Sequence, residues 1–247
     1  MERWERLTGG ELAAQLGLPR VEVRAATGST MDDAHALAAG GAPAGTLVLA
    51  DVQQAGRGRH GRPWTSRPGA GIWLTLLARE LDPATVGVLS LRLGIHAAAA
   101  LDAFAEEPVR LKWPNDLYVQ ERKLGGILVE ARWRDARLEW AALGVGINVV
   151  APVDVAVAGG LRPEARRRDV LEALVPALVE AASQRGQLTP AELAAFGRRD
   201  LARGRQCVSP EAGRVVGLAA DGALVVERDI GPIHLRTGSL VLREEAS

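Results

Sequence analysis

The sequence predicts an α+β protein in which a mixed β-sheet flanked by helices is followed by a smaller region of short strands. Two observations support this prediction. Up to about residue 204, strand-like apolar runs are joined in some places by segments of helical periodicity and in others by tight turns. From Arg205 onward, short alternating runs are separated by turn signals at Asp221-Gly222 and Gly231-Pro232. We therefore expect one domain over residues 1–204 and a second over residues 205–247.

The composition restricts the classes of function. Lys plus Arg and Asp plus Glu both number 30, so the chain has no overall charge that would attract nucleic acid or anionic lipid. Cys207 is the only cysteine, which excludes an intramolecular disulfide. The N-terminus lacks an apolar signal core, and no run of about 18 apolar residues offers a membrane span. We expect a cytoplasmic protein with no nucleic-acid or membrane partner.

The first elements lead to a helix with clear start and stop signals. Residues 10–18 are predicted to form a short helix and 21–25 a strand, which leaves too little chain before them for a helix-turn-helix module. A second helix is expected after Gly28, with Ser29 or Thr30 as N-cap and Gly40 at its end. These hydroxyls could serve only as caps. The local pattern favours that interpretation, but a helix start that follows the first strand, on the same side as the arginines of residues 53–64, could also offer its hydroxyls and free N–H groups to a ligand.

Residues 53–64, here called the Arg loop, connect two predicted strands at 46–52 and 72–78. The loop has the sequence QQAGRGRHGRPW, with three arginines and three glycines. Its GRGRHG formally matches a dinucleotide-binding motif, but Pro63 and Pro68 follow at once and prevent the helix which that motif must open. Guanidinium groups bind carboxylate and phosphate oxygens, so the loop predicts a site for a small anion. Because its like charges repel, we expect the loop to open readily without a ligand.

The middle of the chain adds a helix and three strands. Residues 82–104 are predicted to form a long helix packed on the sheet, and 109–113 a strand that runs into the turn Pro114-Asn115-Asp116. Lys123 begins the next strand, and residues 138–149 return as its hairpin partner. A single lysine or aspartate in such positions is usually solvated surface. The alternate glycines Gly144 and Gly146 free one face of the last strand, where a flat ligand could lie.

The C-terminal half predicts helices over 169–184 and 190–203 that cover the sheet, followed by about forty residues of short strands that suggest an SH3-like barrel. The histidines at 35, 60, 96 and 234 lack metal-ligand spacing, so no protein metal site is expected.

Together, GST, QQAGRGRHGRPW, KWPND, LYVQERKLGGILVE and GVGIN resemble the motifs of the biotin protein ligases, in order and spacing, from about Val21 to Val149. The resemblance implies the biotin ligase type of mixed-sheet catalytic domain, related to class II synthetases, with a small SH3-like C-terminal domain. It also implies two reactions. Biotin and ATP, which brings Mg²⁺, give biotinyl-5′-AMP and pyrophosphate, and a lysine of a biotin carboxyl carrier protein or domain then takes the biotin.

The resemblance also implies the site residues. The biotin contacts are Ser29, Thr30, Met31, Gln53, Arg57, Gly58, Arg59, Lys123 and Gly126; the ATP or adenylate contacts are Arg59, Arg62, Trp64, Lys112, Asn115 and Asn148; the catalytic residues are Lys123, Arg57, Arg59 and Asp116. Asp116 would orient the incoming amine or help Mg²⁺. Met31 is a departure, because many relatives have Asn there; a thioether can pack on a ligand but makes no amide contacts.

Two alternatives stay open. Lipoate ligation shares the adenylation chemistry and a related fold. A non-enzymatic biotin-responsive regulator would need a DNA-binding module, for which the sequence offers no candidate. A homodimer is compatible with the sequence, which identifies neither the acceptor protein nor the strand order.

Overall fold

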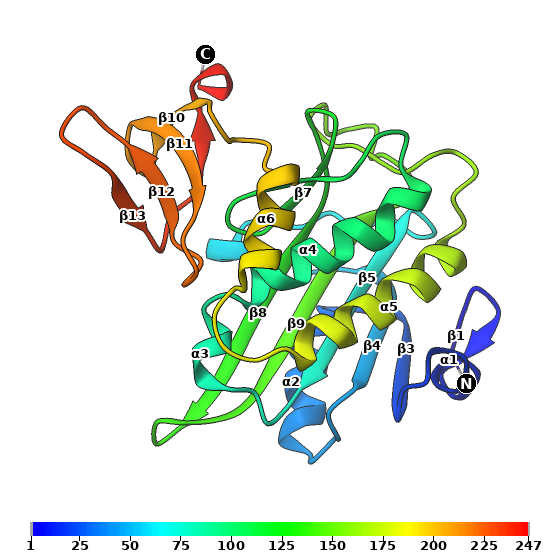
Figure 1. Cartoon of the computed structure of the whole chain (residues 1–247). Coiled ribbons are helices and arrows are strands. Elements are labelled where there is room, and N and C mark those ends of the chain that lie inside the picture. Colours follow the sequence, from blue (N-terminus) through cyan, green and yellow to red (C-terminus); the bar gives the residue numbers. More distant parts are fainter. Residues whose placement is uncertain (1, 247) are drawn as a thin grey trace.

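A computed structural model of the chain describes residues 2–246 and has a seven-stranded mixed sheet as its centre (Figure 1). The strand order is β3-β4-β5-β9-β8-β7-β6; β3 and β4 are parallel and the other neighbours antiparallel. The bounds are β3 Arg20–Thr27, β4 Thr46–Gln53, β5 Gly71–Ala78, β6 Arg110–Lys112, β7 Asp116–Val119, β8 Arg122–Arg134 and β9 Arg137–Asn148. The predicted mixed sheet is confirmed.

Helices cover both faces of this sheet. On one face, α4 (Leu89–Leu101), α5 (Arg167–Ser183) and α6 (Pro190–Arg199) lie over the strands in Figure 1 and enclose the large apolar core. On the other face, α2 (Thr30–Ala39) packs on β4, β5 and β9. The second face has a much smaller core around Met31, Ala34, Val48 and Ala142. A thin apolar layer beside one short helix leaves room for a cavity on that face.

The predicted helix over 82–104 is divided in the structure. It consists of α3 (Pro83–Val86), α4 and a 3₁₀ turn at Asp102–Phe104. Gly87 ends the first piece, and Asp82 caps its start by accepting a hydrogen bond from the Ala84 N–H. Glycine lowers helix stability by roughly 1 kcal/mol relative to alanine, so the chain can turn there at little cost.

A short N-terminal hairpin precedes the first helix and was not predicted. It pairs β1 (Arg3–Trp4) with β2 (Leu7–Thr8) and leads into α1 (Gly9–Leu16). Arg167 of α5 holds the hairpin, because its guanidinium lies 4.5 Å from the Trp4 ring centroid and 2.8 Å from the Glu5 carboxylate. The same guanidinium pairs with Asp51 of β4 at 2.7 Å. A buried arginine therefore joins three distant segments.

The C-terminal region is a five-stranded antiparallel sheet in the order β13-β12-β11-β10-β14. Its strands are β10 Gln206–Ser209, β11 Gly213–Leu218, β12 Leu224–Glu227, β13 Ile233–Leu235 and β14 Val241–Leu242. Within residues 2–246 the edge strands β13 and β14 do not pair, so the sheet is open in its hydrogen bonding. It contacts the larger sheet through Trp113, whose indole N–H donates to the Gly222 carbonyl at 3.1 Å.

Asp200, which lies between α6 and β10, should make the free energy of unfolding depend on pH. Its side chain is buried, one oxygen accepts the Ala202 N–H at 2.9 Å, and the other has no partner. Burial raises the pKa of Asp200 to about 6, although backbone N–H groups and nearby arginines oppose the shift. Since the unfolded pKa is about 3.9, the folded state is penalised as pH rises from about 4 to 6 and bears the full penalty above that range.

We expect Asp200→Asn to raise the free energy of unfolding by about 2 kcal/mol at pH 8 and by clearly less at pH 4.5. Urea unfolding at the two pH values measures the difference. The exposed Asp229→Asn is the control and should change neither value. An equal gain for Asp200→Asn at both pH values would contradict the pKa argument.

Candidate active site

All fifteen predicted site residues line one cavity of about 590 Å³ on the α2 face of the sheet. The start of α2, the Arg loop, the central strands and the C-terminal residues 239–241 and 245 surround it. Segments that are far apart in the sequence therefore meet at one place, and the fold brings the predicted site residues together.

Part of the cavity wall is a compact group of neutral polar side chains. Thr30 donates from its backbone N–H and hydroxyl to the Gln53 amide oxygen at 2.9 and 3.0 Å, and its hydroxyl lies 2.8 Å from that of Thr75. The Gln53 oxygen is thus taken by protein donors, which leaves its NH₂ group for a ligand. Ser29 caps α2 by accepting the Met31 N–H at 3.3 Å and also lines the cavity. Ser29 can therefore cap the helix and still face a ligand in the cavity.

Thr75 was missed by sequence reasoning. It lies in the apolar run of β5, between Leu74 and Leu76, which belong to the large apolar core. A hydroxyl within such a run was the available signal, because a buried polar group needs a partner.

The sheet glycines are covered by protein side chains. A Cβ at Gly144 would lie 2.7 Å from the Met31 methyl carbon, and one at Gly146 would lie 2.8 Å from the Trp64 indole. Met31 is 3% exposed, so it forms part of the apolar floor. The glycines therefore make room for Met31 and Trp64, whereas sequence reasoning expected a bare surface for a flat ligand.

Lys123 and Asp116 form an ion pair inside the cavity, with Nζ and Oδ1 2.7 Å apart. The same ammonium lies 5.6 Å from the centroid of the Trp64 ring. Lys123 thus lies between a carboxylate and an aromatic face and can reach an anion in the cavity.

The C-terminal region contributes a carboxylate to the same cavity. Both oxygens of Glu245 lie 2.6 Å from Nζ of Lys112, which is 7% exposed. Sequence reasoning missed Glu245, because it is 133 positions from Lys112 and belongs to no motif. Asn115 and Asn148, which were predicted to contact the nucleotide, are hydrogen-bonded to the protein itself. Asn115 donates to the Ile127 carbonyl at 2.7 Å, and Asn148 donates to the Lys123 carbonyl at 3.4 Å.

Arg59 and Arg62 are the cavity arginines that form no ion pair among the described residues. Arg59 donates to the Gly238 carbonyl at 3.0 Å. Burial lowers the pKa of Arg59, Asp116 opposes that shift and the charge of Arg62 adds to it. A desolvated cation beside a second cation is stabilised by an anion, so this part of the cavity suits a carboxylate or phosphate.

The Arg loop makes several hydrogen bonds that its charge pattern does not predict. Gly58 and Trp64 donate backbone N–H groups to Arg62 and Gly56 at 2.8 Å, which closes a small hairpin. Ala55 donates to the Gly28 carbonyl at 2.8 Å and ties the loop to the start of α2. Ion pairs of Arg57 with Asp32 and Glu130 hold the loop further.

The mixed sheet with its flanking helices has the fold of solved biotin protein ligases. The structure of biotin protein ligase from Aquifex aeolicus in complex with biotin and ATP superimposes with a TM-score of 0.74 and 25% identity, covering 90% of this chain and 98% of that one. Residues 26–148 match the model of the biotin/lipoate A/B protein ligase family.

Curated relatives agree over part of their length. Bifunctional ligase/repressor BirA from Bacillus spizizenii is 40% identical over 122 residues, which are 49% of this chain and 38% of the relative. Biotin--[acetyl-CoA-carboxylase] ligase from Mycobacterium tuberculosis is 40% identical over 151 residues, 58% of this chain and 55% of the relative. The chain thus spans about half or less of the lengths of these two proteins.

Among the described residues, no helix is both long and apolar enough to cross a membrane.

Proposed function

We propose that this chain is a biotin protein ligase, which activates biotin with ATP and transfers it to a lysine of a biotin carboxyl carrier protein or domain. The observation that carries the proposal is the arrangement of one cavity. Thr30, Gln53 and Thr75 give its wall a group of neutral hydrogen-bonding side chains. Arg59 and Arg62 also line it and form no ion pair with a carboxylate among the described residues. A ligand with a flat polar head and a carboxylate that must meet a phosphate matches both parts.

In the first reaction, a biotin carboxylate oxygen attacks the α-phosphorus of ATP, a mixed anhydride forms, and the bond to pyrophosphate breaks. Two anions must approach each other, so the barrier is lowered by fixed cations rather than by a protein nucleophile. We assign this role to Arg59, Arg62 and Lys123. Trp64 lies over the sheet beside Lys123 and would exclude water from the anhydride.

In the second reaction, a lysine amine of the carrier attacks the biotinyl carbonyl, an amide bond forms and AMP leaves. The amine must lose a proton before or during this step. Asp116 lies 2.7 Å from Lys123 in the cavity and is placed to accept a hydrogen bond from that amine once the adenylate has drawn Lys123 to its phosphate.

Mg²⁺ is expected to arrive with ATP. Among residues 2–246, no cluster of three or more His, Cys, Asp or Glu side chains could hold a metal. Asp116 and Glu245 are the carboxylates of the cavity, and both are paired with lysines. A hard cation held mainly by phosphates and water fits this set, and it would neutralise charge on the phosphates.

The proposal also covers the domains of the chain, its oligomeric state and its location in the cell. Residues 1–204 would form the catalytic domain and residues 205–247 an SH3-like domain, supported by the five antiparallel strands and their change of composition. The exposed Trp133 at the end of the β8–β9 hairpin is compatible with a homodimer. We place the protein in the cytoplasm because the reaction requires ATP.

Mass spectrometry tests the function directly. A biotin carboxyl carrier domain incubated with the protein, biotin and MgATP should gain one biotinyl group on one lysine. Omission of ATP should abolish the gain. No gain in any carrier, together with no biotin-dependent pyrophosphate release, would refute the proposal.

Lipoate is the second candidate, because the matching family includes lipoate ligases. Biotin is favoured by the neutral polar side chains of the cavity wall, since a dithiolane ring would leave the Gln53 NH₂ group without an acceptor. Pyrophosphate release with each acid separates the two: we expect it with biotin and not with lipoate.

A further inference from the structure

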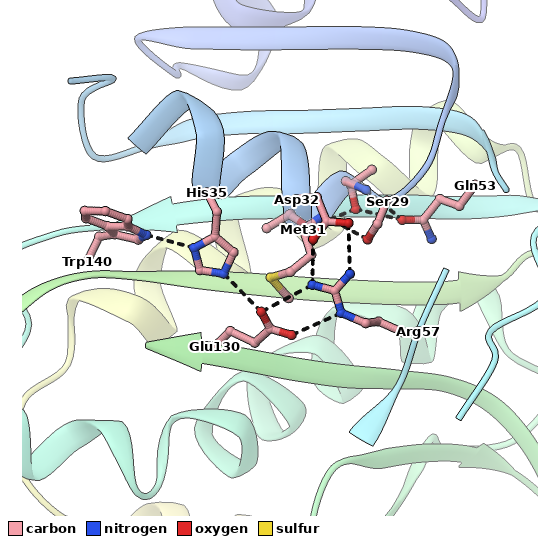
Figure 2. Close-up of polar contacts among 10 residues, drawn as sticks. Ser29, Met31, Asp32, His35, Gln53, Arg57, Glu130 and Trp140 are labelled. Atoms are coloured by element: carbon pink, nitrogen blue, oxygen red, sulfur yellow. Dashed lines mark hydrogen bonds and ion pairs between the residues drawn. The ribbon is translucent and has the colours of Figure 1, made fainter. Parts of the chain in front are cut away.

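Arg57, the first arginine of the Arg loop, is held by two carboxylates from different elements (Figure 2). Its Nη1 and Nη2 donate to both oxygens of Asp32 at 3.0 and 2.8 Å. Its Nε and Nη2 donate to Glu130 at 3.3 and 3.4 Å. Asp32 lies in the first turn of α2 and Glu130 in β8, so one side chain ties the loop to a helix and to a central strand.

The charges around Arg57 favour anchoring over ligand binding. Two carboxylates face one guanidinium, and the hydrogen bond from Arg57 lowers the pKa of Asp32. A ligand carboxylate that approached this group would meet a net negative charge. Arg59 has no carboxylate partner in the described chain and is therefore better placed to receive it.

The position of Glu130 is fixed in turn by His35 and Trp140. The indole N–H of Trp140 can only donate, so Nδ1 of His35, 2.9 Å away, must be an unprotonated acceptor. The ring proton then lies on Nε2, which donates to Glu130 at 3.1 Å. One tautomer of His35 satisfies both neighbours, and Figure 2 shows the resulting chain from Trp140 to Arg57.

We propose that Asp32 and Glu130 are positioning residues that make Arg57 the anchor of the Arg loop, and that His35, kept in its Nε2–H tautomer by Trp140, orients Glu130. The anchor is a property of the free protein. Its consequence for catalysis, a loop that presents Arg59 to the biotin carboxylate, rests on the proposed function.

Trypsin measures the anchor without any ligand. The protease must bind the arginine side chain, so the two ion pairs should protect the bond after Arg57. In the Asp32→Asn/Glu130→Gln double variant, we expect this cut to accelerate on the order of tenfold relative to the wild type. Asp33→Asn is the matched control: it makes the same change one residue along α2, but Asp33 contacts Arg24 and Thr27. Equal cutting after Arg57 in the wild type and the double variant would overturn the proposal.

Nuclear magnetic resonance of the ring nitrogens tests the His35 part in the folded wild type. At alkaline pH we expect His35, assigned by its loss in His35→Gln, to be the Nε2–H tautomer. Trp140→Phe keeps an aromatic ring but removes the donor, and should give a mixture of tautomers. An Nδ1–H ring in the wild type, or an unchanged tautomer in Trp140→Phe, would overturn this part.

Kinetics then connect the anchor to the reaction. The double variant should raise KM for biotin several-fold in pyrophosphate release while kcat changes much less, and Asp33→Asn should match the wild type. A normal KM in a variant that trypsin shows to have lost its anchor would overturn the positioning role. Failure of the wild type itself to use biotin would refute the proposed function and leave the trypsin and resonance results standing.

Discussion

Arg59→Gly is expected to weaken the binding of biotin and of its adenylate by roughly ten- to a hundred-fold. The reason is the loss of a charge-assisted contact worth about 1.5 to 3 kcal/mol at a cation that forms no ion pair within the described chain. Because a weakly held adenylate escapes, lysines of bystander proteins should become biotinylated. Calorimetry measures the binding, and a biotin blot of added albumin measures the escape.

Arg59→Lys is the control for this prediction. Arg59 also donates to the Gly238 carbonyl, so its removal loosens a contact between the loop and the C-terminal region. Lysine retains the charge but lacks the guanidinium fork, and should give an intermediate affinity with little escape. If Arg59→Gly labels only the carrier lysine with near-normal affinity, Arg59 does not confine the adenylate.

Much of the fold could be predicted because the pattern of apolar residues is local. Short apolar runs bounded by turn residues mark buried strands such as β4 and β5, and the Ser29 and Gly40 signals mark both ends of α2. The order of strands could not be derived, since β9, the predicted hairpin partner of β8, pairs on its other side with β5 through contacts remote in sequence. The N-terminal hairpin was missed for the same reason, because its partner Arg167 lies 162 positions away from Glu5.

For the site as well, the sequence shows which residue types are present but not which side chains pair with one another. The sequence contains the arginines of the loop and the lysines of KWPND and KLGG, and all of them line the cavity. Charges alone do not reveal partners. Arg57 and Arg59 are two positions apart, yet Asp32 and Glu130, 25 and 73 positions from Arg57, neutralise only the first. The prediction that the free loop opens readily neglected these contacts.

Lys123→Ala is expected to slow adenylate formation by at least roughly ten- to a hundred-fold, because removing the ammonium deletes a contact to the ligand anion. A second effect should add to this loss. The substitution also leaves the Asp116 carboxylate without its ion-pair partner, since Oδ1 is buried and has no other partner in the described chain. An uncompensated carboxylate then faces the biotin carboxylate.

The double variant Lys123→Ala/Asp116→Asn separates these two effects. If repulsion by Asp116 contributes, biotin should bind the double variant more tightly than Lys123→Ala alone, although still more weakly than the wild type. Equilibrium binding of biotin is the appropriate measurement, because Asp116 has its own proposed role in the transfer step. Circular dichroism should show intact folding in both variants. Equal affinities in the single and double variants would mean that the Asp116 charge does not act on the ligand, and wild-type affinity in Lys123→Ala would remove Lys123 from the site.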